Sequence, residues 1–164
     1  MELFSRTFAD AEGHAEGQSI ARLVQDLLGT TAQPDLYCFV AREEDQIVGS
    51  IVFSRLQFET GIQAFILAPV AVATECQGRG MGQALIAHGL ATLERDGVEL
   101  VIVYGDPAFY AKAGFQPVAQ AVIPAPCQLQ QPHGWQAQSL TGDAIRPIHG
   151  GCTCVEALNR PDYW

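Results

Sequence analysis

Positive charge is scarce in this chain. Lysine occurs once, at Lys112, and Lys and Arg together number 9 against 18 Asp and Glu, which gives a formal net charge of −9. A protein that binds a nucleic-acid backbone needs clustered Lys and Arg to displace counterions. We therefore expect no nucleic acid among the partners, and the acidic balance favours a cationic or neutral one.

Long apolar runs and a paired set of cysteines are also missing. No run approaches the roughly 18 apolar residues of a membrane span, and residues 1–13 carry acids without the apolar centre of a signal peptide. The five cysteines are an odd number, which is most simply explained by reduced thiols. We expect a cytoplasmic protein without membrane contact.

What the sequence does contain is the composition of a folded domain. The 164 residues are 48% hydrophobic and 16% charged, which is typical of a globular protein. A chain of this length buries roughly 70% of the surface that its unfolded form exposes, so it needs no disulfide bonds to be stable. We expect a single domain over residues 1–164.

The first part of the chain predicts a strand and a helix. Residues 2–8 alternate loosely and could form a first strand, after which Asp10 is a plausible N-cap. Residues 17–29 place apolar side chains at i, i+3, i+4, i+7 and i+8, and the pattern ends at Gly29. This spacing predicts an amphipathic helix.

A meander of three antiparallel strands is predicted next. Apolar runs cover 36–42, 46–58 and 62–72, and charged or glycine-containing turns separate them. Pro69 lies inside the third run. Because proline donates no ladder hydrogen bond, we expect a bulge or a departure from the neighbouring strand there.

The second half predicts a βαβ unit followed by a less regular segment. Residues 82–93 carry a second apolar helical stripe, and 98–105 read as a buried strand that would lie parallel to the third. A short helix begins at Pro107 and stops at Gly114. Residues 117–134 contain four prolines and predict an irregular loop, with weak strand candidates at 135–140 and 150–158.

The segment ECQGRGMGQALIA begins the second helix on glycines, which cost a helix stability. Helix N-termini present unpaired N–H groups and bind phosphate, and glycines let the backbone approach the ligand. Gly78, Gly80 and Gly82 therefore fit a phosphate cradle, with Arg79 as a candidate added cation.

Two common phosphate loops do not fit this turn. A Walker A loop needs Gly-Lys-Ser/Thr where the chain reads Gly82-Gln83-Ala84, and the dinucleotide fingerprint fails whether it starts at Gly78 or at Gly80. The pattern that remains is Q-x-x-G-x-G, formed by Gln77, Gly80 and Gly82.

This stretch and its flanks resemble motif A of the GNAT superfamily of N-acyltransferases. The likeness runs through LAPVAVATECQGRGMG and VELVIVYGDPAFYAKAGFQPV, with Tyr110, Gly114 and Phe115 matching the terminal Y…GF of the family. It covers the core 62–118 and is thin over the C-terminal loop and strands at 119–164. The resemblance implies an α/β (α+β) fold with a mixed, mostly antiparallel central sheet, helices on both faces, and the element order β-α-β-β-β-α-β-α.

The resemblance also implies a cosubstrate, acetyl-CoA, and a role for each matching residue. The backbone of Val70, Ala71 and Val72 would pair with the pantetheine arm, and the Val72 N–H would bind the oxyanion. Tyr110 would protonate the CoA sulfur, since its pKa lies near that of the thiol (roughly 10 against 8.5 for the reference side chains). The pyrophosphate would be held by the backbone of the glycine turn, which comprises Gln77, Gly78, Arg79, Gly80, Met81, Gly82 and Gln83.

The general base and the acceptor are not determined by the sequence. Residues 62–74 contain no carboxylate, and Glu75, Glu59 and Asp106 are awkwardly placed, so water could serve as the base. The acceptor would be a small-molecule or peptide amine. A homodimer and a non-catalytic acyl-CoA-binding module both stay open.

A third interpretation is a metal-binding protein built on the C-terminal cluster. His149, Cys152 and Cys154 have metal-ligand chemistry, with His133 as a candidate fourth ligand. Zinc sites more often use C-x₂-C spacing, so we favour a strand of small residues packed on the sheet, with no metal.

Overall fold

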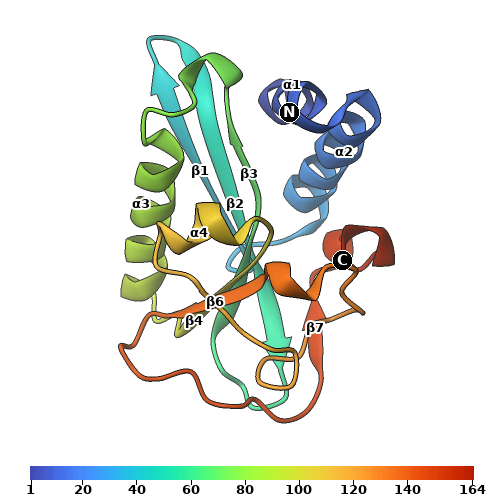
Figure 1. The fold of residues 1–164 in the computed structure, drawn as a ribbon, viewed down its shortest axis with the longest axis vertical. Helices are drawn as coiled ribbons and strands as arrows, with labels where there is room; N and C mark the ends of the chain where they lie inside the picture. The colour runs from blue at the N-terminus through green and yellow to red at the C-terminus, as the bar shows by residue number, and fades with distance from the viewer.

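A seven-stranded sheet runs through the middle of the molecule in a computed structural model that describes residues 1–164 (Figure 1). The strand order is β1-β2-β3-β4-β6-β5, and β7 pairs with β2 beyond this path. Every pairing is antiparallel except that of β3 with β4. This confirms the predicted meander and βαβ unit. The strands are β1 (Leu36–Glu43), β2 (Gln46–Phe58), β3 (Ala64–Val72), β4 (Leu100–Tyr104), β5 (Gln116–Pro117), β6 (Trp135–Ser139) and β7 (Cys152–Cys154).

Helices cover both faces of the sheet, as expected. In Figure 1, α3 lies on one side of the sheet and the pair α1 and α2 lies on the other. None of the helices combines the length and apolar character that crossing a membrane requires. The helices are α1 (Glu2–Glu12), α2 (His14–Thr30), α3 (Met81–Arg95) and α4 (Pro107–Ala111), with short 3₁₀ turns at Thr74–Cys76, Pro132–Gly134, Glu156–Leu158 and Pro161–Tyr163.

The prediction of a strand at residues 2–8 is wrong, because these residues belong to helix α1. Phe4 and Thr7 are its buried residues, and a spacing of three residues places them on one helical face. Asp10 is consequently not an N-cap and lies inside α1. Two helices therefore precede the first strand, in place of the strand and helix that begin the order implied by the resemblance.

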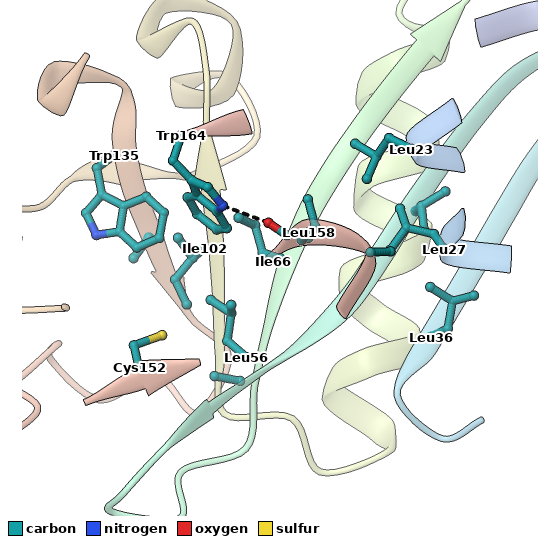
Figure 2. Packing of buried hydrophobic residues seen from close by; sticks show 14 of the residues in the cluster. Leu23, Leu27, Leu36, Leu56, Ile66, Ile102, Trp135, Cys152, Leu158 and Trp164 are labelled. Atoms are coloured by element: carbon teal, nitrogen blue, oxygen red, sulfur yellow. Dashed lines mark hydrogen bonds between the residues drawn. The ribbon is translucent and has the colours of Figure 1, made fainter. Parts of the chain in front are cut away.

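Each face of the sheet has its own apolar core. The core beneath α3 includes Phe53, Phe65 and Ile86. The opposite core packs α2 and the C-terminal segment against the sheet, and Figure 2 shows Leu23 and Leu27 near Ile66 and Leu158.

The irregular segment 117–134 contributes to this second core. Ile123 and Leu129 are buried in it, and the Ile123 carbonyl accepts a hydrogen bond of 2.9 Å from the indole of Trp135. The indole of Trp164 likewise donates to the Leu158 carbonyl at 2.9 Å (Figure 2). The predicted loop is thus irregular in backbone but anchored by apolar side chains.

Pro69 marks a β-bulge, as predicted. Ile51 pairs with Val70 and Phe53 pairs with Leu67, so Ala68 and Pro69 of β3 together face one residue of β2. On the other edge, the pairing of β3 with β4 ends at Leu67 and Val103. Beyond the bulge, β3 therefore has one edge without a neighbouring strand.

We predict that Gly89→Ala destabilises the protein because α3 lies against β2 at this glycine. A Cβ at residue 89 would lie 2.5 Å from Phe53 Cε2 and 3.2 Å from Ile51 Cδ1. The expected loss in the free energy of unfolding is about 1–3 kcal/mol, measured by urea denaturation.

Gly29→Ala is the matched control, since a Cβ there meets nothing within 4 Å. It should leave stability unchanged or raise it by up to about 1 kcal/mol. Equal stability of the two variants would contradict the close packing of α3 on the sheet.

Candidate active site

A cavity of about 900 Å³ lies where β3 and β4 separate. Its lining comes from the end of β3, the glycine turn, the first turn of α3, α4, the pair α1 and α2, and the C-terminal segment. Of the eleven residues that the sequence singled out, nine line this cavity: Val70, Val72, Gln77, Gly78, Gly80, Met81, Gly82, Gln83 and Tyr110.

The remaining two predicted residues do not line the cavity. Ala71 is 1% exposed and belongs to the core beneath α1 and α2, so only its backbone is available for the predicted contact. Arg79 is exposed and does not contribute to the lining. The contribution of Arg79 to phosphate binding stays a prediction.

The glycine turn leaves backbone N–H groups free at the start of α3. Gly78 and Gly80 have φ angles of 73° and 78°, a left-handed conformation that glycine adopts without steric cost. Gly80 is the N-cap of α3 and supplies no side-chain cap. The amides of Met81, Gly82 and Gln83 have no acceptor in the chain, and unpaired amides of this kind at a helix N-terminus attract anions.

The end of β3 presents a backbone N–H group to the cavity. Ala73 donates its N–H to the Val48 carbonyl on β2 at 2.8 Å. Because successive N–H groups of a strand point to opposite edges, the Val72 N–H points away from β2 toward the unpaired edge. The Val72 carbonyl accepts a hydrogen bond of 3.0 Å from the Gln77 side chain, which ties the glycine turn to the strand.

Tyr110 is held in the cavity by residues of α4 and of the segments on either side of it. The Asp106 carboxylate caps α4 by accepting from the Ala108 N–H at 2.9 Å. The phenol ring makes edge contacts with Phe109 and Phe115, at centroid distances of 5.0 and 5.9 Å. A Cβ at Gly105 would lie 2.9 Å from Tyr110 Cε2, so this glycine makes room for the ring.

The Tyr110 hydroxyl has no hydrogen-bond partner in the chain, although the residue lines the cavity. Burial, and secondarily the nearby Asp106 carboxylate, raises the pKa of Tyr110 to about 12. The phenol is therefore neutral at physiological pH and carries a proton that it can donate to a ligand.

The first turn of α3 and helix α4 are in direct contact. The Gln83 side chain donates to the Phe109 carbonyl at 3.2 Å, and a Cβ at Gly82 would lie 3.3 Å from the Phe109 ring. The glycine turn and Tyr110 are thus fixed relative to each other through Phe109.

The three acids considered as bases all have structural partners. Glu75 pairs with Arg6 at 2.7 Å, and a hydrogen bond from its own backbone N–H, with a contribution from Arg6, holds the pKa of its carboxyl below the usual range. Glu59 accepts from the Gly151 N–H at 2.9 Å, and Asp106 caps α4. Of the three, only Asp106 lines the cavity, and its carboxylate is engaged in capping α4.

One wall of the cavity is formed by residues that the sequence did not single out. Glu12 and Glu16 from the α1–α2 pair and Asp162 from the last 3₁₀ turn contribute to the lining. No local pattern could have found them, because they come from opposite ends of the chain and the helix that carries Glu12 was not predicted.

The C-terminal cysteines are part of the sheet. Cys152 and Cys154 lie in β7 beside β2, and burial raises the pKa of their thiols to about 12 and about 11. No group of three or more His, Cys, Asp or Glu side chains that could hold a metal ion is present. The arrangement supports the interpretation of a packed strand.

Comparisons with known proteins agree with this geometry. Residues 34–117 match the family model described as an acetyltransferase (GNAT) domain. The chain is 37% identical over 147 residues to YjhQ, an uncharacterized N-acetyltransferase of Escherichia coli K12, covering 86% of this chain and 78% of that protein. It is 29% identical over 154 residues to a second uncharacterized N-acetyltransferase of that strain, YhbS, covering 88% of this chain and 86% of YhbS.

Two solved structures are similar over nearly the whole chain. The crystal structure of E. coli YhbS in complex with CoA matches with a TM-score of 0.80 and 28% identity, covering 97% of this chain and 84% of that one. A GNAT family acetyltransferase from Brucella melitensis, in complex with acetyl-CoA, shares the fold with a TM-score of 0.71 at 24% identity, covering 96% of this chain and 88% of that one.

We predict that the Tyr110 phenol ionises near pH 12. The neutral form is favoured only in the folded state, so stability should fall as the pH rises from the ordinary value of 10.0 toward about 12. The measurement is the tyrosinate absorbance of the wild type minus that of Tyr110→Phe during alkaline titration.

Gly105→Ala should lower the pKa of Tyr110 toward 10, because the added methyl group displaces the ring from its packed position. Gly29→Ala should not change it. If the tyrosinate absorbance assigned to Tyr110 rises at the ordinary tyrosine pKa in the folded wild type, the ring is not enclosed as described.

Proposed function

The chain belongs to the GNAT acetyltransferase family, and on that premise we propose that it binds acetyl-CoA in the cavity between β3 and β4 and transfers the acetyl group to an amine. Transfer would be direct, in a ternary complex, without an acyl-enzyme. The observation that carries the proposal is the uncapped N-terminus of α3, with two left-handed glycines before it, placed beside the free edge of β3.

The fit to acetyl-CoA rests on the chemistry of the cavity. The amides of Met81, Gly82 and Gln83 can donate to the pyrophosphate, and a Cβ at Gly78 or Gly80 would point into open space. The unpaired edge of β3 can accept the amide-containing pantetheine arm as an added strand. The YhbS structure, whose chain is similar over nearly all of this one, was solved with CoA.

The chain's own residues would assist each bond change. As the amine nitrogen attacks the thioester carbon, the Val72 N–H donates to the oxygen on which negative charge develops. When the C–S bond breaks, its electrons remain on sulfur and the Tyr110 hydroxyl donates to the thiolate. The ammonium proton leaves through water, since Glu75, Glu59 and Asp106 have structural partners.

The raised pKa changes the role expected of Tyr110. A phenol with a pKa of about 12 is a weaker acid than a thiol near 8.5, so complete transfer of its proton to the thiolate is unfavourable by itself. Tyr110 would therefore stabilise the leaving thiolate mainly by hydrogen bonding, and the sulfur gains its proton as the phenol recovers one released by the amine.

A non-catalytic CoA-binding module, the alternative function, would need no hydrogen-bond donor beside the CoA sulfur. The unpartnered Tyr110 hydroxyl, held by Gly105, Phe109 and Phe115 in the cavity, favours the enzyme. Activity measurements on a Tyr110 variant separate the two.

We predict saturable binding of acetyl-CoA to the wild type by calorimetry, and a loss of affinity of at least about 100-fold in Gly80→Glu. The added carboxylate would lie where the pyrophosphate is expected, and like charges in contact cost several kcal/mol. Gly142→Glu is the matched control, because Gly142 also has a positive φ and open space around its Cβ. No binding by folded wild-type protein, or an equal loss in both variants, would refute the cradle.

We also predict that Tyr110→Phe lowers kcat by about 100-fold while the affinity for acetyl-CoA stays within a few-fold of the wild type, since a hydrogen bond made only to developing charge acts on the transition state. Thiol release with an amine panel measures this. Tyr37→Phe removes a hydroxyl that donates to Asp96 outside the cavity and should retain full activity. Unchanged turnover in Tyr110→Phe would remove Tyr110 from the mechanism.

A further inference from the structure

The cavity has two walls of different chemistry. On the α3 side it is lined by the glycine turn and α4, where the one carboxylate, Asp106, accepts a hydrogen bond from the Ala108 N–H. The other wall is built by α1, α2 and the C-terminal segment, which Figure 1 shows on the opposite side of β3 from α3. This second wall carries Glu12, Glu16 and Asp162.

These three carboxylates have no partner in the chain. The two salt bridges of the molecule join Arg6 to Glu75 and Arg55 to Asp35, and no side-chain hydrogen bond is made to Glu12, Glu16 or Asp162. The single cationic side chain of the lining is Lys112, beyond the end of α4. An unpaired negative charge at a cavity wall favours a bound cation.

The same segments supply aromatic and apolar surface beside the acids. Phe8 comes from α1, Ile20 and Leu23 come from α2, and Tyr163 and Trp164 follow Asp162. Aromatic faces attract ammonium groups, and apolar side chains accept a hydrocarbon body.

The acidic wall shares its cavity with Tyr110. Tyr110 is half-buried, and its hydroxyl has no hydrogen-bond partner in the chain. That hydroxyl is therefore free to donate to a molecule bound in the cavity.

We propose that the acceptor is an amine that carries a second positive charge on an apolar or aromatic body. This inference rests on the proposed function. One amine loses its proton and attacks the thioester, while the second stays charged and lies against Glu12, Glu16 and Asp162. Acceptors with a carboxylate in the second position are rejected by the same wall.

Three probes of equal chain length test the charge preference: hexamethylenediamine, hexylamine and aminocaproate. Each is titrated into protein saturated with CoA, which binds without acetyl transfer. We expect the diamine to bind about fivefold more tightly than hexylamine, and aminocaproate about fivefold more weakly than hexylamine. The preference should weaken as salt rises.

Charge-removing variants locate the effect. Glu12→Gln combined with Glu16→Gln, and separately Asp162→Asn, should bring the affinity ratio of diamine to hexylamine toward one without changing the affinity for acetyl-CoA. Glu94→Gln, at an exposed position of α3 outside the lining, should leave the ratio unchanged.

Equal affinity of the three probes for the wild type, or a ratio that survives in the variants, overturns the inference. Acetyl-CoA calorimetry keeps the two proposals apart. If acetyl-CoA does not bind, the proposed function fails; if it binds and the amines are not distinguished, only the acceptor class fails.

Discussion

The bulge at Ala68 and Pro69 is the constraint on which the rest of the site depends. Up to Leu67, β3 is hydrogen-bonded on both edges; beyond the bulge it keeps β2 and loses β4. Buried backbone groups need partners, so a strand edge left open inside a sheet must be satisfied by water or by a ligand. The opening that exposes this edge is also the cavity.

The glycine turn and Tyr110 both take their positions from this opening. The turn follows β3 directly and is tied back to it by the bond from Gln77 to the Val72 carbonyl. Helix α4 follows β4 and is joined to the first turn of α3 by Gln83 and the close approach at Gly82. The two strands that diverge thus each deliver one part of the site, and Phe109 sets the distance between the parts.

Local patterns predicted the elements whose contacts are local. Apolar runs bounded by turns predicted β2 and β3, which are buried along most of their length. The helical stripe predicted α3, because burial on one face repeats with the period of the helix. Residues 2–8 were misread since their apolar side chains fit both periods, and packing of α1 against the sheet decided the outcome. The carboxylates of the second wall were missed for a stronger reason: Glu12, Glu16 and Asp162 meet only in the folded chain.

Two polar contacts connect the acidic wall to the phosphate cradle. Arg6 of α1 pairs with Glu75 at 2.7 Å, and Thr74 donates to Asp10 at 2.7 Å. Both reach the 3₁₀ turn that lies between β3 and the glycines. Exposed pairs of this kind contribute little stability individually. Their placement matters more, because they attach the helix that carries Glu12 to the segment that precedes the glycine turn. The two walls of the cavity are therefore fixed relative to each other.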